Sequence, residues 1–289
     1  MINDFAEDVV DQLLTMVSTS PHTCHLLIDG VFLPSISFLV KRWPTPVADR
    51  YALFCERANG DANTLAASPW LLPLTTDTST LRELILRCDR LPAVTLIRSP
   101  SDVNTLLGRL KRWTVVNCGG MHFNFRYPDT RRLPGIYGVL TDAQRNTLFA
   151  NDAWSFIGRD GRWHHLPPCT APINTSTVAA DDVADPELSD AQFAALLADS
   201  EADEQLAAIW QDLPENSLAR ASSSPAQVHA WAVSVLAQAN HLSITDMPER
   251  TRLCTWVLSG DPTQRLTMLK QQGNGALENS LDDLLMEGI

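Results

Sequence analysis

Residues 121–141 read MHFNFRYPDTRRLPGIYGVLT, a strand pattern that passes into a charged loop and then into the start of a helix. Polar and aromatic side chains alternate along the first part, which predicts a strand with one polar and one aromatic face. The polar positions are 122, 124 and 126, and the aromatic ones are 123, 125 and 127. Pro128 and Asp129 end this pattern. Thr141, with Gln144 three residues later, is typical of a helix N-terminus.

The loop between the strand and the helix carries Arg126, Arg131, Arg132 and Asp129. The charged side chains of a loop beside a sheet usually either bind a ligand or partner, or form ion pairs that stabilise the loop itself. Both interpretations stay open here. The structural one is a salt bridge between Arg126 and Asp129. The functional one is that the arginines bind carboxylates or backbone carbonyls of a protein partner, since a guanidinium forms bidentate hydrogen bonds.

Upstream of this stretch, helix and strand patterns alternate from residue 80 onward, which predicts an α/β N-terminal domain with a mixed sheet flanked by helices. Capping residues and apolar spacing predict helices at 80–89 and 103–112. The remaining expected helices of this half lie at 4–17, 32–40 and 141–149. Strands are expected at 24–28, 50–55, 66–74, 93–97 and 113–116, with a hairpin over 151–166.

After residue 166 the strand patterns stop, and an acidic, all-α C-terminal domain is expected. We place an α/β domain at 1–168, a linker at 169–186 and the helical domain at 187–289. The helices of the second domain are expected at 189–212, 225–241, 246–258 and 261–272. The tail at 277–289 is amphipathic, and it either docks on its own domain or lies in a groove of a partner.

The net charge of the 289-residue chain is −12, and it is unevenly distributed. Residues 81–145 carry eleven basic and five acidic side chains, a net charge of +6. An acidic chain with one basic segment argues against nucleic-acid binding. The basic segment is instead expected to meet an acidic surface, either on a partner or on the second half of the chain.

Targeting and membrane signals are missing from the sequence, which predicts a cytoplasmic protein. The first residues are acidic and lack a signal-peptide pattern. No apolar run approaches the roughly 20 residues of a membrane span. The six cysteines are scattered without a C-x-x-C motif, which is typical of reduced thiols in a cytosol.

Motifs for catalysis or cofactor binding are also missing, so we expect no cofactor and no metal. There is no G-x-G-x-x-G, P-loop or H-E-x-x-H motif. Cys118 and His122 are four residues apart, but no second pair supports a metal site. Ser68 has no G-x-S-x-G frame, and Pro69 after it lacks the N–H of an oxyanion hole, so we do not expect a nucleophile there.

Several segments resemble one known family, the type VI secretion effector chaperones or adaptors, whose domain is catalogued as domain of unknown function 4123. The similar segments are FRYPDTRRL at 125–133, LTDAQ at 140–144, LIDGV at 27–31 and SPWLLPL at 68–74. The resemblance extends over about residues 24–166. One departure is Pro128-Asp129, where the family more often has Asp-Pro, so the partner of this carboxylate does not carry over.

The resemblance implies a cytoplasmic, non-catalytic adaptor that binds a type VI effector near its N-terminal loading region and helps attach it to the spike protein VgrG. We expect the basic segment to bind one partner and the helical part to bind the effector. The residues expected at a partner-binding surface are Arg126, Tyr127, Asp129, Arg131, Arg132 and Asp29. For Asp29, a cap on the following helix is the structural alternative.

Two other function classes stay open at this stage. One is an α/β hydrolase or a nucleotide-binding enzyme, which requires a pocket where titratable groups meet. The other is an immunity protein, which binds the toxin domain of an effector rather than its loading region.

Overall fold

The computed structural model describes all residues except 1, 34, 45–47, 75–76, 170–184 and 273–289. The chain forms two compact units, Met1–Leu197 and Ala198–Ile289. The division falls within one helix, α9 (Asp190–Ile209). The linker expected at 169–186 lies almost entirely outside the described residues, as does the tail at 277–289, so both stay predictions.

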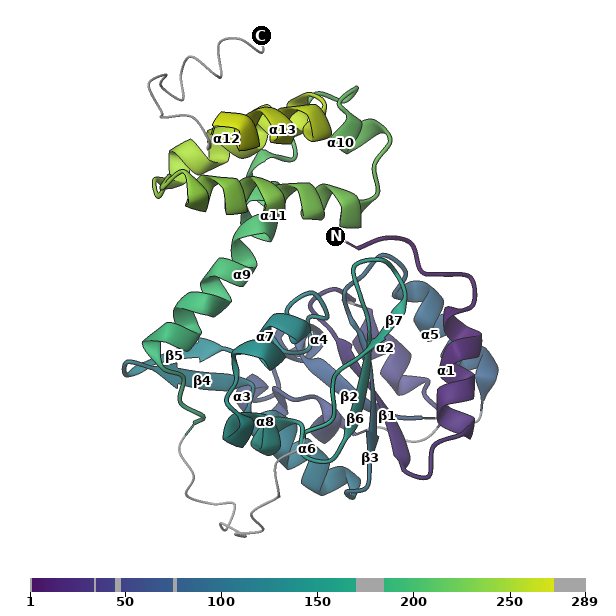
Figure 1. Ribbon diagram of the computed structural model, residues 1–289. Coiled ribbons are helices and arrows are strands. Elements are labelled where there is room, and N and C mark those ends of the chain that lie inside the picture. Colours follow the sequence, from purple (N-terminus) through teal and green to yellow (C-terminus); the bar gives the residue numbers. More distant parts are fainter. Residues whose placement is uncertain (1, 34, 45–47, 75–76, 170–184, 273–289) are drawn as a thin grey trace. The chain divides into compact units, whose positions relative to one another are not determined.

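The first unit is built on a five-stranded sheet with helices on both faces (Figure 1), which confirms the expected α/β class, although we expected a mixed sheet and this one is antiparallel. The strand order is β2-β1-β3-β6-β7, and every pairing is antiparallel. The strands are β1 (Thr23–Asp29), β2 (Pro69–Pro73), β3 (Val94–Ser99), β6 (Ala153–Ile157) and β7 (Trp163–His165). A second sheet contains only β4 (Val115–Cys118) and β5 (Met121–Asn124).

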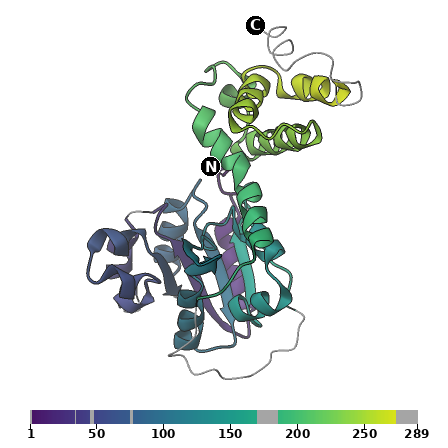
Figure 2. The same ribbon diagram turned by 90° about the vertical axis from the view of Figure 1, so that its left-hand side faces the viewer.

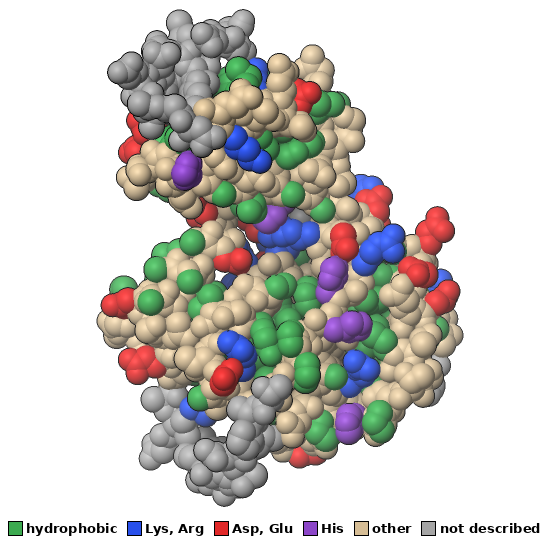
Figure 3. Space-filling model, viewed as in Figure 1, with side chains coloured by type: hydrophobic (Ala, Val, Ile, Leu, Met, Phe, Trp, Pro, Cys, Tyr) green, Lys and Arg blue, Asp and Glu red, His purple; other side chains and the backbone are tan. Residues whose placement is uncertain are grey.

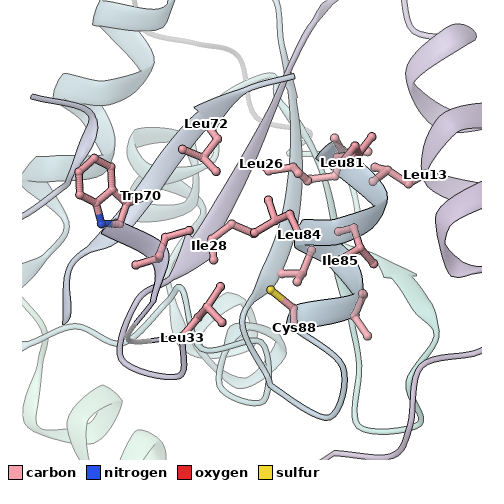
Figure 4. Packing of buried hydrophobic residues seen from close by; sticks show 14 of the residues in the cluster. Leu13, Leu26, Ile28, Leu33, Trp70, Leu72, Leu81, Leu84, Ile85 and Cys88 are labelled. Carbon is pink, nitrogen blue, oxygen red and sulfur yellow. The ribbon is translucent and has the colours of Figure 1, made fainter. Parts of the chain in front are cut away.

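One face of the five-stranded sheet packs against helices from the first part of the chain (Figure 4). These helices are α1 (Val9–Ser18), α2 (Ile36–Lys41) and α5 (Thr78–Arg87). Leu26 and Ile28 of β1 face this side, where they meet Leu84 and Ile85 of α5. Asp77 begins α5, since its carboxylate accepts the N–H groups of Ser79 and Thr80.

The opposite face carries a second apolar cluster, which includes Leu27 of β1 and Trp154 of β6. The helices that contribute buried apolar residues to this cluster are α6 (Val103–Arg112), α7 (Leu133–Val139) and α8 (Asp142–Leu148), and the start of α9 packs against it. Both neighbours of β1 are strands and both of its faces are buried, so β1 lies in the middle of the layered structure (Figure 2).

The predicted aromatic strand at 121–127 is only partly regular. Its first four residues form β5, which pairs with β4 rather than with the main sheet. Gly119 and Gly120 connect the two strands with φ angles of +57° and +81°, which favour glycine. Phe125 and Tyr127 then enter the second cluster as irregular chain. The charged loop therefore leaves a hairpin beside the main sheet, not the sheet itself.

Two predicted elements between residues 30 and 60 differ from the structure. The strand expected at 50–55 is wrong: Asp49–Tyr51 forms a 3-10 helix, η1, and Cys55–Ala58 forms α3. Ala52 makes only an isolated bridge to Trp70. The helix expected at 32–40 begins later, as α2. A further helix, α4 (Ala62–Ala67), leads into β2.

The second unit is helical throughout its described part, as predicted. After the end of α9 come α10 (Leu218–Ala221), α11 (Pro225–His241), α12 (Met247–Ser259) and α13 (Pro262–Gln272). Its core contains Val235, Trp256 and Val257. Arg250 is buried in this unit, where it donates to both carboxylate oxygens of Glu201 and to the backbone oxygen of Ile244.

Candidate functional site

Asp29 is the last residue of the inner strand β1, and its side chain is almost completely buried, with 1% exposed. The next residue, Gly30, packs directly against the chain that leads into β2. A Cβ at Gly30 would lie 2.3 Å from the backbone oxygen of Ser68, so only glycine fits here. The Gly30 N–H donates to that same oxygen at 3.2 Å. This close approach fixes the end of β1 and the direction of the Asp29 side chain.

The Asp29 carboxylate joins two distant parts of the chain. Its Oδ2 accepts from Nη2 of Arg126 at 2.6 Å, and its Oδ1 accepts from the backbone N–H of Val31 at 3.2 Å. The carboxylate thus stabilises the turn after β1. It does not cap the next helix, because α2 begins at Ile36 with Ser35 as its N-cap. The interpretation of Asp29 as a helix cap is therefore wrong.

Burial raises the pKa of Asp29 to about 6, although the positive charge of Arg126 and the Val31 hydrogen bond both act to lower it. Burial dominates because nearly all of the carboxyl group is shielded from water, whereas a single guanidinium hydrogen bond replaces that hydration only in part. Asp129 adds a further negative charge nearby. The group therefore titrates close to neutral pH.

Asp129 and Arg131 form a second ion pair within the loop. Oδ1 of Asp129 accepts from Nε of Arg131 at 3.0 Å, and Oδ2 accepts from Nη2 at 2.7 Å. The backbone N–H of Arg131 also donates to Oδ1. The expected salt bridge between Arg126 and Asp129 is thus replaced by two others, because Arg126 reaches across to Asp29 while Asp129 takes the nearer arginine.

Both arginines lie against one aromatic ring, that of Phe32. The guanidinium carbon of Arg126 is 5.6 Å from the ring centroid, and that of Arg131 is 5.2 Å away. These distances are within the range of cation–π attraction. Sequence reasoning missed Phe32, which it placed in a helix. The only available signal was its position three residues after Asp29. We call Asp29, Phe32, Arg126, Asp129 and Arg131 the arginine–phenylalanine cluster.

Tyr127 and Arg132, the other two residues expected at the site, do not belong to the cluster as defined. Tyr127 is fully buried, and its hydroxyl donates to the backbone oxygen of Leu110 at 2.9 Å. Tyr127 therefore supports the loop from inside and offers no surface to a partner in this conformation. Arg132 is half-buried and stands at the N-cap position of α7. Arg126 is more accessible than Arg131, with 39% of its side chain exposed against 17%.

Sequence reasoning also missed a buried ion pair near Tyr127. Arg109 of α6 donates to Asp152, which directly precedes β6, and the two side chains are 14% and 0% exposed. Burial lowers the pKa of Arg109 and raises the pKa of Asp152, and in each case the opposite charge counteracts the shift. This pair joins a helix to the sheet, so its role is structural.

The basic segment at 81–145 is largely neutralised within its own unit. At least eight of its eleven cationic side chains form ion pairs with carboxylates of the first unit. Figure 3 accordingly shows basic and acidic side chains interspersed rather than gathered in a patch of one sign. These side chains are therefore paired with carboxylates of the same half of the chain, and not with a partner or with the second half as we expected.

Side chains with possible catalytic chemistry are engaged in structural contacts. Ser68 is buried, and its hydroxyl accepts from the N–H of Phe54 and donates to the oxygen of Pro69. Ser155 contacts Nδ1 of His165 at 2.8 Å, but its hydroxyl is fully buried between strands. Within the described ranges, no three His, Cys, Asp or Glu side chains converge as metal ligands would. None of the helices described is both long and apolar enough to cross a membrane.

The comparison with protein families gives a single result for the first unit. Residues 24–147 match the family described as "Domain of unknown function (DUF4123)". The matched range begins in β1 and ends in α8, so it contains every residue of the arginine–phenylalanine cluster. Neither the comparison with curated proteins nor the comparison with solved structures gave a match.

Proposed function

We propose that this protein is a cytoplasmic adaptor-chaperone of a type VI secretion system, which binds an effector near its N-terminal loading region and promotes its attachment to the VgrG spike. In this proposal the protein acts by non-covalent binding and is not an enzyme. The observation that carries it is the match of residues 24–147 to DUF4123, a family associated with such adaptors.

The arginine–phenylalanine cluster is the binding surface that we propose within this domain. Arg126 gives one N–H to Asp29 and keeps 39% of its side chain exposed above the Phe32 ring. A guanidinium held in this way is suited to a carboxylate or a backbone carbonyl of a partner. Val31, beside the ring, is 43% exposed and adds apolar contact area. Arg131 is less available to a partner, because its Nε and Nη2 already donate to Asp129 and only 17% of its side chain is exposed.

The proposal is tested by co-purification of the tagged chain with a type VI effector and a VgrG protein from the same organism. We compare the wild type with Arg126→Gln, which keeps a hydrogen-bond donor for Asp29 but removes the charge. Arg87→Gln is the matched control, since Arg87 is exposed on α5 and pairs only with Glu83 of the same helix. We expect Arg126→Gln to weaken binding of one partner at least tenfold, or about 1.4 kcal/mol, and Arg87→Gln to leave it unchanged.

Two further results decide between this function and its rivals. An adaptor retains binding to an effector fragment that contains only the N-terminal loading region, whereas an immunity protein requires the toxin domain. Deletion of the gene should abolish delivery of the effector while leaving the secretion apparatus active. Full delivery by the deletion strain would refute the proposal.

A further inference from the structure

Cys55 and Lys111 lie in direct contact although they are 56 residues apart. Cys55 is the first residue of α3, and Lys111 belongs to the last turn of α6. Nζ of Lys111 is 3.1 Å from Sγ of Cys55 and 2.7 Å from a carboxylate oxygen of Glu56. The thiol is also oriented on its other side, since Sγ lies 3.8 Å from the backbone oxygen of Arg50. Thiol, amine and carboxylate thus meet at one point.

This arrangement distinguishes Cys55 from the other five cysteines. Cys24, Cys88, Cys118 and Cys254 are buried, and only Cys55 and Cys169 are partly exposed. Lys111 is one of only three lysines in the chain, with Lys41 and Lys270. Its side chain is 18% exposed, so the amine is held close to the thiol, while small molecules can still approach Cys55 from the solvent.

We propose that Cys55 and Lys111 form an oxidative crosslinking site, in which a hydroperoxide converts the contact into a covalent sulfur–nitrogen bond. In the first step, the sulfur of Cys55 attacks the peroxide, the O–O bond breaks, and the products are a sulfenic acid and water or an alcohol. The sulfur loses two electrons and the peroxide gains them. In the second step, the neutral amine of Lys111 attacks the sulfenic sulfur, and hydroxide leaves as water with a proton from the nitrogen.

Glu56 has a defined part in the second step. Burial lowers the pKa of Lys111, but the hydrogen bonds to Glu56 and Cys55 outweigh it, and the net shift is upward. The ammonium must therefore lose a proton before it can attack. The Glu56 carboxylate is 80% exposed and in contact with Nζ, so it provides a path for that proton to the solvent. The condensation is expected to be faster in mildly alkaline buffer than in neutral buffer.

The bond would connect α3 to α6 and close a long loop that contains β2, α5 and β3. A crosslink of this kind restricts the unfolded chain and stabilises the fold, more so when the closed loop is long. The inference concerns a modification of the chain itself and does not depend on the proposed adaptor function.

The test uses the purified full chain, hydrogen peroxide in mildly alkaline buffer, and peptide mapping by mass spectrometry. We expect a linked pair of peptides that contain Cys55 and Lys111, with a mass two hydrogen atoms below that of the reduced pair. Dithiothreitol should restore the separate peptides. The linked protein should also unfold at a higher Tm than the reduced protein.

Four variants serve as controls. Cys55→Ser and Lys111→Arg should abolish the linked peptides. Cys169→Ser and Lys41→Arg, which remove the other partly exposed thiol and another lysine, should leave them unchanged. A Tm measurement on each unoxidised variant shows that it folds. The inference is refuted if the wild type yields only sulfinic or sulfonic acid at Cys55, a linkage between other residues, or a linkage that retains an oxygen atom.

Discussion

Nη2 of Arg126 lies 2.6 Å from Oδ2 of Asp29, and this contact joins the charged loop to the end of strand β1 across 97 residues. The two partners differ strongly in their surroundings, since 39% of the arginine side chain is exposed and 1% of the aspartate side chain. The exposed part of the Arg126 guanidinium is available to bind a partner, while its hydrogen bond to Asp29 stabilises the loop. Partner binding and loop stabilisation can be measured separately.

The first prediction concerns the electrostatic coupling of this pair. Arg126→Ala removes the largest influence that lowers the pKa of Asp29, so the pKa should rise further above its value of about 6. Arg131→Ala should raise it less, because Arg131 pairs with Asp129 and acts on Asp29 only from a distance. Titration of the aspartate carboxyl carbons by NMR measures both shifts. An unchanged Asp29 pKa in Arg126→Ala would mean that the contact is not maintained in solution.

The second prediction concerns the stability of the first unit against pH. Asp29 has a pKa of about 6 in the fold and about 4 in the unfolded chain, so the folded state binds its proton more tightly. The free energy of unfolding should therefore decrease as pH rises from about 4 to about 6, by about 2–3 kcal/mol from this group alone. Asp29→Asn removes this part of the slope. Urea denaturation of both proteins across this pH range would show it, and parallel slopes would contradict the raised pKa.

Local sequence patterns predicted most of the elements correctly, because the signals that fix them are local. The helix at 103–112 has Asp102 as its cap and leucines at helical spacing, and α6 has those limits. The same holds for α11, whose predicted range is the observed one. The strand at 50–55 failed because alternation over Tyr51, Leu53 and Cys55 also fits a turn followed by a short helix.

The pairing of residues within the site could not be predicted from local sequence patterns, because it depends on contacts between residues far apart in the chain. The sequence identified Asp29 and the loop arginines, but the structural one of its two interpretations paired Arg126 with Asp129, its near neighbour in the chain. The fold brings Asp29 closer, and Arg131 can reach Asp129 because it lies two residues beyond it. Phe32 was missed since its role arises only when the turn after β1 faces the arginine loop.

The third prediction concerns the buried pair of Arg109 and Asp152. Asp152→Ala leaves a buried guanidinium without its carboxylate, and it should lower the free energy of unfolding by about 3–5 kcal/mol. The double variant Arg109→Leu/Asp152→Leu should recover part of that loss, because no unpaired charge stays in the interior. Chemical denaturation of the two variants measures the difference. A double variant that is less stable than Asp152→Ala would contradict this prediction. It would show that the hydrogen bonding and packing of the two side chains stabilise the fold beyond the neutralisation of their charges.

The fourth prediction uses two glycines with opposite surroundings. A Cβ at Gly30 would lie 2.3 Å from the backbone oxygen of Ser68 and 2.5 Å from that of Ala66. Gly30→Ala must therefore displace the chain that leads into β2, with an expected loss of about 2–4 kcal/mol. In Gly138, within α7, a Cβ would meet no atom within 4 Å. Gly138→Ala should instead stabilise the fold by about 0.5–1 kcal/mol, since alanine favours the helix.

Thermal unfolding of the two variants beside the wild type tests this pair of expectations. Because Gly30 adjoins Asp29, the displacement in Gly30→Ala should also loosen the Asp29–Arg126 contact. The NMR titration of Asp29 should therefore change in Gly30→Ala and remain as in the wild type in Gly138→Ala. A Gly30→Ala protein with wild-type Tm and an unaltered Asp29 titration would contradict this prediction. It would show that the backbone at the end of β1 can accommodate a Cβ next to the Ser68 oxygen.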